Sequence, residues 1–77
     1  MLTPRQHETL LFLMAYIRAH GYAPTFDEIA EGLGLASKSG VARILNRLEA
    51  GGFIRRLPRR QRAIEILRTP NQHEEQT

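Results

Sequence analysis

Cysteine is absent from this 77-residue chain. Without thiols the chain can form neither disulfides nor thiolate metal sites, which fits a reducing cytoplasm as its expected location. No cationic segment followed by an apolar one opens the sequence, and the longest apolar run, residues 10–17, is far too short to span a membrane. We therefore expect neither secretion nor membrane insertion.

Aromatic side chains are also scarce, at 6% of residues with no tryptophan, whereas hydrophobic residues make up 42%. These proportions predict a small, aliphatic and mostly helical core. A chain of this length makes one domain, near the lower limit for folding without cross-links. We expect residues 1–68 to form that domain and residues 69–77, which offer little to bury, to be a disordered polar tail.

Acidic residues are rare in the second half of the chain. Residues 38–68 hold nine Lys or Arg residues against two Glu, a local excess of +7 in a protein whose net charge is +3. A basic half on a compact domain is typical of nucleic-acid binders. The alternative, a basic surface that serves only solubility, is less consistent with charge this concentrated.

Residue patterns that carry catalysis or cofactor binding are missing. The histidines His7, His20 and His73 are scattered, and none has an acidic partner at ligand or triad spacing. There is no glycine-rich phosphate loop. We therefore expect no enzyme activity, no cofactor and no metal.

The first helix is predicted over residues 4–20. Thr3 and Gln6 can form a capping box around Pro4, and Gly21 is suited to a left-handed stop. Its inward stripe is expected to be Leu10, Leu13 and Ile17.

Leu11 and Met14 fall on a different side of this helix, which is apolar nearly all round. One interpretation is loose core packing, since single exposed apolar residues are ordinary. The other is a surface for a homodimer or a protein partner.

Residues 24–48 have the pattern of a helix-turn-helix. Thr25 and Glu28 can form a capping box, residues 34–36 make a short turn, and Ser37 can cap a second helix. The apolar positions of that second helix are Val41, Ile44, Leu45 and Leu48. In a helix-turn-helix the second helix usually enters the major groove of DNA.

If that stripe faces inward, small, basic and amide side chains face outward. These are the residue types that contact base edges and phosphates. The expected DNA-binding residues here are Lys38, Ser39, Ala42, Arg43, Asn46 and Arg47.

Two short β-prone runs follow, at residues 53–57 and 63–67. They predict an antiparallel hairpin that packs on the helices through Phe53, Ile54, Ile64 and Ile66. The fold class is therefore mainly α with a small β-hairpin: a winged helix-turn-helix of three helices and a two-stranded wing. Its tip carries Arg59, Arg60 and Arg62, which could reach phosphates or a minor groove, or serve only as a soluble basic turn.

The chain resembles the N-terminal DNA-binding domain of LexA-type repressors without gaps over residues 2–67. The matching motifs are L-T-P-R-Q at 2–6, G-Y-A-P-T-F-D-E-I-A at 21–30, L-x-S-K-S-G-V at 35–41, L-E-x-G-G-F-I-R-R-L-P at 48–58 and R-A-I-E-I at 62–66. Two of them, S-K-S-G and G-F-I-R-R-L-P, are most similar to the alphaproteobacterial branch, which is associated with GTTC-type direct repeats.

The resemblance implies a bacterial transcription regulator of the SOS-response family, more specifically a repressor that binds double-stranded DNA. It implies operator reading by Ser37, Lys38, Ser39, Ala42 and Arg43, and backbone contacts by Arg59, Arg60 and Arg62. Arg43 is our first choice for base readout, since arginine is the usual bidentate partner of guanine. The alternative for Arg43 is a phosphate contact or a pair with a side chain four residues away.

LexA-type repressors carry a C-terminal peptidase-like domain that dimerises and cleaves its own linker at an Ala-Gly bond. Nothing in residues 68–77 resembles that domain, so self-cleavage does not carry over, and we expect either an excised domain or a stand-alone relative. Ala50-Gly51 repeats the dipeptide, but it is predicted to end a helix. A homodimer on paired half-sites would then need another contact, which draws attention to Leu11 and Met14.

Overall fold

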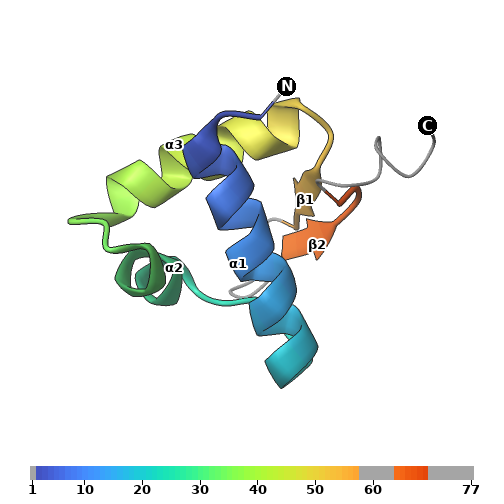
Figure 1. Ribbon diagram of the computed structural model, residues 1–77, viewed down its shortest axis with the longest axis horizontal. Helices are drawn as coiled ribbons and strands as arrows, with labels where there is room; N and C mark the ends of the chain where they lie inside the picture. Colours follow the sequence, from blue (N-terminus) through green and yellow to red (C-terminus); the bar gives the residue numbers. More distant parts are fainter. Residues whose placement is uncertain (1, 58–63, 70–77) are drawn as a thin grey trace.

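The computed structural model describes residues 2–57 and 64–69 (Figure 1). Three helices are followed by two short strands: α1 (Pro4–His20), α2 (Phe26–Leu33), α3 (Lys38–Ala50), β1 (Ile54–Arg56) and β2 (Ile64–Ile66). This confirms the winged helix-turn-helix predicted from the sequence.

The first two helices begin with the predicted capping boxes. In α1 the Thr3 hydroxyl accepts a hydrogen bond from the Gln6 backbone N–H at 3.1 Å, and the Gln6 side chain accepts one from the Thr3 N–H at 3.2 Å. At the start of α2 the Thr25 hydroxyl accepts from the Glu28 backbone N–H at 3.2 Å, and the Glu28 side chain accepts from the Thr25 N–H at 2.8 Å. These bonds satisfy N–H groups that a helix start leaves without intrahelical partners.

Glycine ends α1 and α3. Gly21 adopts a left-handed φ of 81° directly after α1, as expected. Gly51 follows α3 and donates its backbone N–H to the Arg47 carbonyl at 3.0 Å. Ala50-Gly51 is therefore a helix end inside the domain, as predicted.

The core lies where the three helices and β1 meet. The three helices contact one another in all pairs, and α3 also contacts β1. Of the stripe predicted on α3, Val41, Leu45 and Leu48 are fully buried, and Ile44 is partly buried against them. The fully buried aliphatic residues from the other elements are Leu10, Leu13, Ile29 and Ile54.

The stripe predicted on α1 was wrong at its C-terminal end. Ile17 is only half-buried and lies outside the core cluster, whereas Met14 packs against that cluster. Thr9 is fully buried, and its hydroxyl donates to the Arg5 carbonyl at 2.8 Å. The reason is geometric: the last turns of α1 project beyond α2 and α3, so the burial stripe ends early (Figure 1).

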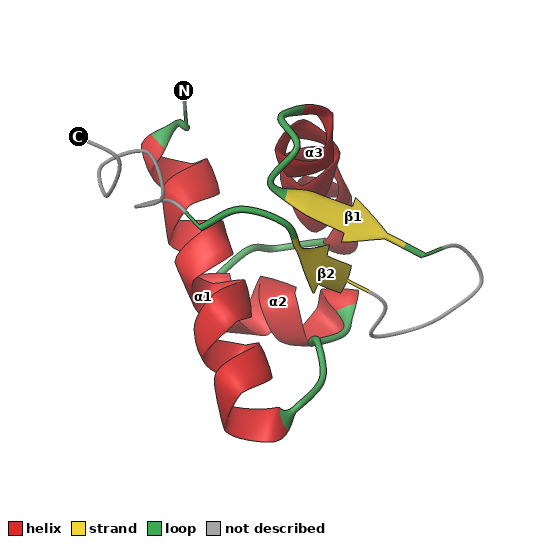
Figure 2. Ribbon diagram, turned by 90° about the vertical axis from the view of Figure 1, so that its right-hand side faces the viewer, coloured by secondary structure: helices red, strands yellow, loops and turns green. Residues whose placement is uncertain are grey.

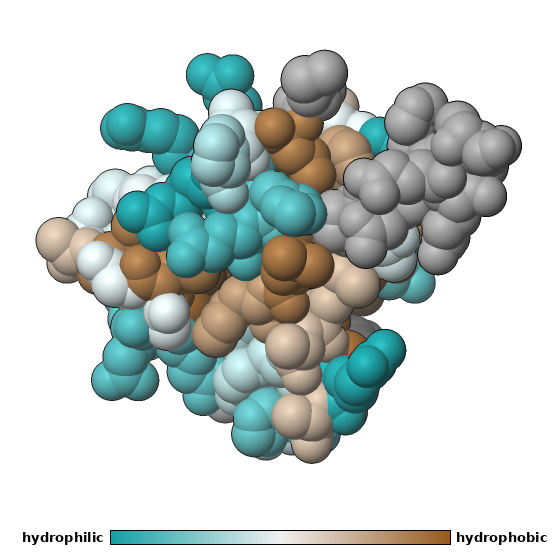
Figure 3. All heavy atoms as spheres, viewed as in Figure 1, coloured by the Kyte–Doolittle hydropathy of each residue, from teal (hydrophilic) through white to brown (hydrophobic). Residues whose placement is uncertain are grey.

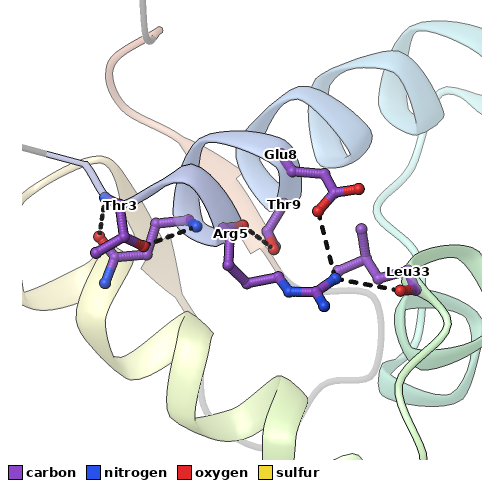
Figure 4. Close-up of polar contacts among 6 residues, drawn as sticks. Thr3, Arg5, Glu8, Thr9 and Leu33 are labelled. Carbon is purple, nitrogen blue, oxygen red and sulfur yellow. Dashed lines mark hydrogen bonds and ion pairs between the residues drawn. The ribbon is translucent and has the colours of Figure 1, made fainter.

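Arg5 ties the start of α1 to the end of α2 (Figure 4). Its Nη1 donates to the Leu33 carbonyl at 3.2 Å and to Glu8 Oε1 at 3.3 Å. The Leu33 carbonyl is one of those that the end of α2 leaves without an intrahelical partner. Because α2 leads through Gly34 into the turn before α3, this contact helps to orient the helix-turn-helix.

The two strands pair antiparallel, with Ile54 opposite Ile66 and Arg56 opposite Ile64. Seen from the side, this small sheet lies beside α3 (Figure 2). Ile54 is buried, and Phe53, Ile64 and Ile66 are partly buried against the core, as predicted. Over the described residues, no helix is long and apolar enough to cross a lipid bilayer.

Candidate nucleic-acid interface

Helix α3 has two chemically distinct faces. Its apolar stripe is in the core. Four of the polar residues predicted to bind DNA are exposed away from that stripe: Ser39, Arg43, Asn46 and Arg47. Their spacing of i, i+4, i+7 and i+8 places them along one side of a helix. The structure therefore assembles the outward face expected from the sequence.

Arg43 and Arg47 are the available cations of this face. Both are exposed, and neither side chain makes a hydrogen bond or an ion pair with the residues that the structure describes. They lie one helical turn apart, so each adds to the local positive potential. The alternative that Arg43 pairs with a side chain four residues away finds no support among the described residues.

The start of α3 lacks the side-chain capping hydrogen bonds that begin α1 and α2. Ser37 occupies the predicted N-cap position in an extended conformation, but its hydroxyl does not make the capping hydrogen bond. Ser37 and Lys38 are both exposed. Lys38 Nζ lies 3.5 Å from Asp27 Oδ1 of α2, in a solvent-exposed pair of the kind that contributes little to stability.

Ala42 differs from the other predicted contacts because it is half-buried. Its methyl group lies between the apolar and polar faces of α3.

Asn46 is held by the wing, which the sequence did not indicate. Its Oδ1 accepts a hydrogen bond from Arg56 Nη2 of β1. Arg56 is in turn held by Glu49, with Nε and Nη2 at 3.0 and 2.9 Å from Oε1 and the backbone N–H at 3.2 Å from Oε2. No helical or strand periodicity relates α3 to β1, so no local pattern could have revealed this network.

The Glu49 carboxylate is stabilised in its charged form. Hydrogen bonds from the Arg56 backbone N–H and side chain, with the positive charge of that side chain, hold the pKa of Glu49 below its ordinary value near 4.5. Partial burial opposes this shift but does not outweigh it. Glu49 therefore stays ionised and paired at neutral pH.

The remaining described arginines after α3 are also engaged. Arg55 pairs with Glu65, its cross-strand partner. Arg68 stacks its guanidinium 4.2 Å from the centre of the Phe53 ring and donates to the Gly51 carbonyl at 3.0 Å. The positive charge predicted for the second half is thus partly neutralised within the fold.

The predicted wing-tip contacts, Arg59, Arg60 and Arg62, lie outside the described residues. The same holds for residues 70–77, most of the predicted tail.

The two residues proposed as a partner surface, Leu11 and Met14, differ in burial. Leu11 is 43% exposed, whereas Met14 is half-buried against the core. On the face nearest the viewer in Figure 1, apolar side chains are exposed over the middle of α1 among hydrophilic ones (Figure 3). Only Leu11 therefore keeps the exposure that the partner hypothesis requires.

The histidines of α1 lie on its surface, as expected. His20 stacks on Tyr16 with ring centroids 4.2 Å apart and lies 5.7 Å from the Tyr22 ring. Across residues 2–57 and 64–69, no three His, Cys, Asp or Glu side chains gather closely enough to hold a metal ion.

Comparison with known protein families matches residues 1–63 to the LexA DNA binding domain. The match covers all three helices, β1 and the segment that leads to β2. It therefore includes the face of α3 built from Arg43, Asn46 and Arg47. The domain of this family is regulatory and non-catalytic. The chain belongs to the LexA DNA-binding domain family and is a DNA-binding transcription regulator.

Proposed function

We propose that this protein is a sequence-specific repressor that places α3 in the major groove of its operator. The observation that carries the proposal is the exposed face of α3, where Arg43 and Arg47 stand unpaired within the described structure beside Ser39 and Asn46. Arginine recognises guanine through two parallel hydrogen bonds, so we assign base readout to Arg43. Arg47, one turn later, is assigned to a phosphate.

The start of α3 supports a second anchor on the DNA backbone. Backbone N–H groups at a helix start favour anions, and the positive end of the helix dipole adds to the effect. The Ser37 hydroxyl makes no capping bond, and Lys38 is held only by an exposed pair with Asp27. Ser37 and Lys38 are thus available to a phosphate that approaches the end of α3.

The wing supplies the third part of the proposal. Pairing of β1 with β2 holds these two strands beside α3. We propose that Arg59, Arg60 and Arg62 contact the adjacent backbone or minor groove. Such contacts position a protein on DNA without reading sequence.

Two copies on paired half-sites would increase both affinity and specificity, because one domain of this size contacts few base pairs. The alternative function, a protein-interaction module that uses α1, now depends on Leu11, since Met14 packs against the core. DNA binding explains many more of the described features, so we place it first.

Fluorescence anisotropy with a duplex that carries GTTC repeats and with a scrambled duplex, each at two salt concentrations, tests the proposal. We expect tighter binding to the repeat, with log K falling by about 0.9 for each phosphate neutralised as log salt rises. Arg43→Ala should remove the preference for the repeat. Arg18→Ala, which removes the same charge from the exposed last turn of α1, is the matched control and should keep it.

Equal, weak binding of both duplexes by the wild-type protein would reject sequence-specific recognition. A Leu11→Ser variant distinguishes the alternative function from DNA binding. If α1 binds a protein partner, this variant should lose that binding while its DNA affinity is unchanged. One duplex with two half-sites, compared with a single half-site, reports whether two copies bind together.

A further inference from the structure

Asn46 differs from the other exposed residues of α3 in having a fixed orientation. Among Ser39, Arg43, Asn46 and Arg47, it alone makes a side-chain hydrogen bond within the described structure. The donor is Arg56 Nη2, which belongs to the wing and not to α3. A contact between two elements, rather than a rotamer of α3 itself, therefore sets how this carboxamide is presented.

The identity of the donor determines which end of the carboxamide is engaged. A guanidinium has five N–H donors and no acceptor, so only the oxygen of Asn46 can face Arg56. The NH₂ group occupies the other branch of the planar carboxamide. Asparagine reads adenine with both ends at once, its oxygen accepting from N6 and its nitrogen donating to N7. Arg56 engages one of the two lone pairs of this oxygen, and we take the NH₂ group as the end that Asn46 turns to the duplex.

Arg56 is itself held in this arrangement by Glu49. Glu49 binds it through three hydrogen bonds, one of them to the backbone N–H of β1. Its side chain is 28% exposed, against 59% for that of its neighbour Arg55. The charge of Arg56 is thus neutralised at close range, although it lies within the most basic stretch of the sequence.

We infer that Asn46 is a donor-only contact to DNA whose orientation is set by Arg56 and Glu49, and that Arg56 is a positioning residue and not a phosphate contact. The inference rests on the proposed function, in which α3 faces DNA. The partner of Asn46 is a hydrogen-bond acceptor of the duplex. Phosphate oxygens offer that chemistry, as does purine N7 in the major groove.

Modified duplexes test the donor-only role. In 2-aminopurine the amino group of adenine at position 6 is missing, so a contact that accepts from N6 is lost. We expect that 2-aminopurine at any adenine of the repeat lowers the DNA affinity of the wild-type protein and of Asn46→Ala by the same factor. One 7-deazapurine or one methylphosphonate in the duplex should lower the affinity of the wild-type protein and leave the affinity of Asn46→Ala unchanged. The first modification identifies a purine N7 as the acceptor, and the second a phosphate.

Either of two results would overturn the donor-only role. One is an adenine whose 2-aminopurine replacement weakens the wild-type protein but not Asn46→Ala. The other is equal affinity of Asn46→Ala and the wild type for every duplex.

Salt dependence tests the role of Arg56. Arg56→Gln should lower affinity for the repeat about five- to tenfold, the loss expected for one good contact. It should leave the slope of log K against log salt unchanged. Arg47→Gln, the control on α3, should reduce that slope by about 0.9, because Arg47 is assigned to a phosphate. Arg55→Gln removes the same charge from the neighbouring wing position and should keep the preference for the repeat.

A loss of slope in Arg56→Gln equal to that of a phosphate contact would overturn the positioning role. Glu49→Gln gives a second measurement. A positioning network predicts a lower ratio of repeat to scrambled affinity, whereas a phosphate-binding Arg56 released from Glu49 predicts a steeper salt slope. Circular dichroism confirms that each variant is folded.

If the wild-type protein binds neither duplex, the proposed function fails and the inference with it. If the wild type prefers the repeat and the variants do not behave as stated, only the inference fails.

Discussion

Phe12 of α1 lies against Gly32 of α2 so closely that a side chain at position 32 would displace the Phe12 ring. A Cβ placed on Gly32 would be 2.4 Å from Cε1 and 2.5 Å from Cζ of the Phe12 ring. These are less than ordinary van der Waals separations, so the Phe12 ring keeps this position only because residue 32 is a glycine. This packing matters for function because α2 leads directly into the turn before α3.

Gly32→Ala should destabilise the protein. Alanine favours helix by about 1 kcal/mol over glycine, but forcing the Phe12 ring aside should cost more, within the ~1–3 kcal/mol usual for overpacking. Urea unfolding followed by circular dichroism measures the difference. Gly40→Ala in α3 is the control, because a Cβ there meets only Leu35 Cδ1 at 3.8 Å. It should be neutral or slightly stabilising, and equal stabilisation by both substitutions would contradict the steric argument.

The helix starts should respond differently to loss of their hydroxyl groups. Thr25→Ala removes the bond from the Thr25 hydroxyl to the Glu28 N–H and should cost about 1 kcal/mol of unfolding free energy. Ser37→Ala removes no capping bond and should change stability by less than about 0.5 kcal/mol. Thermal unfolding of the two variants in parallel makes the comparison. A loss for Ser37→Ala as large as that for Thr25→Ala would mean that Ser37 caps α3 in solution.

The attachment of the wing to α3 should weaken in acid. Hydrogen bonds from Arg56 hold the pKa of Glu49 below its ordinary value near 4.5, so the folded state binds its proton less readily than the unfolded state. The resulting stabilisation is complete above that ordinary value and is lost as pH falls below it through the folded pKa. Unfolding free energies measured between pH 7 and pH 3 should therefore decline less steeply for Glu49→Gln. An identical decline in both proteins would disprove the linkage.

Asp27 should restrain DNA binding. It lies 3.5 Å from Lys38 at the start of α3, where it competes with a phosphate for that ammonium group. Asp27→Asn should raise DNA affinity several-fold at low salt, and the gain should shrink as salt screens the charges. Anisotropy titrations at two salt concentrations measure it. Glu8→Gln on α1 removes an equal charge away from α3, so an equal gain there would show that only net charge matters.

Local interactions explain what the sequence determined by itself. The capping boxes at Thr3 and Thr25 need only residues three positions apart, and Gly21 stops α1 because glycine adopts a left-handed φ without steric cost. The buried stripe on α3 follows from helical spacing. The exposed side of Arg43 and Arg47 is then the remaining side of the same helix. Fold class and the outward face of α3 could be predicted because each depends on short-range patterns.

Contacts between elements decided the rest. Ile17 and Met14 have similar apolar character, but only Met14 lies where α1 is covered, and Ile17 falls on turns that extend past the other helices. The hold of Arg56 on Asn46 and Glu49 depends on where the wing lies against α3, and no periodicity in the chain encodes that distance. Sequence pattern thus determined which residues α3 turns outward, whereas tertiary packing decided that Asn46 among them is oriented by a partner.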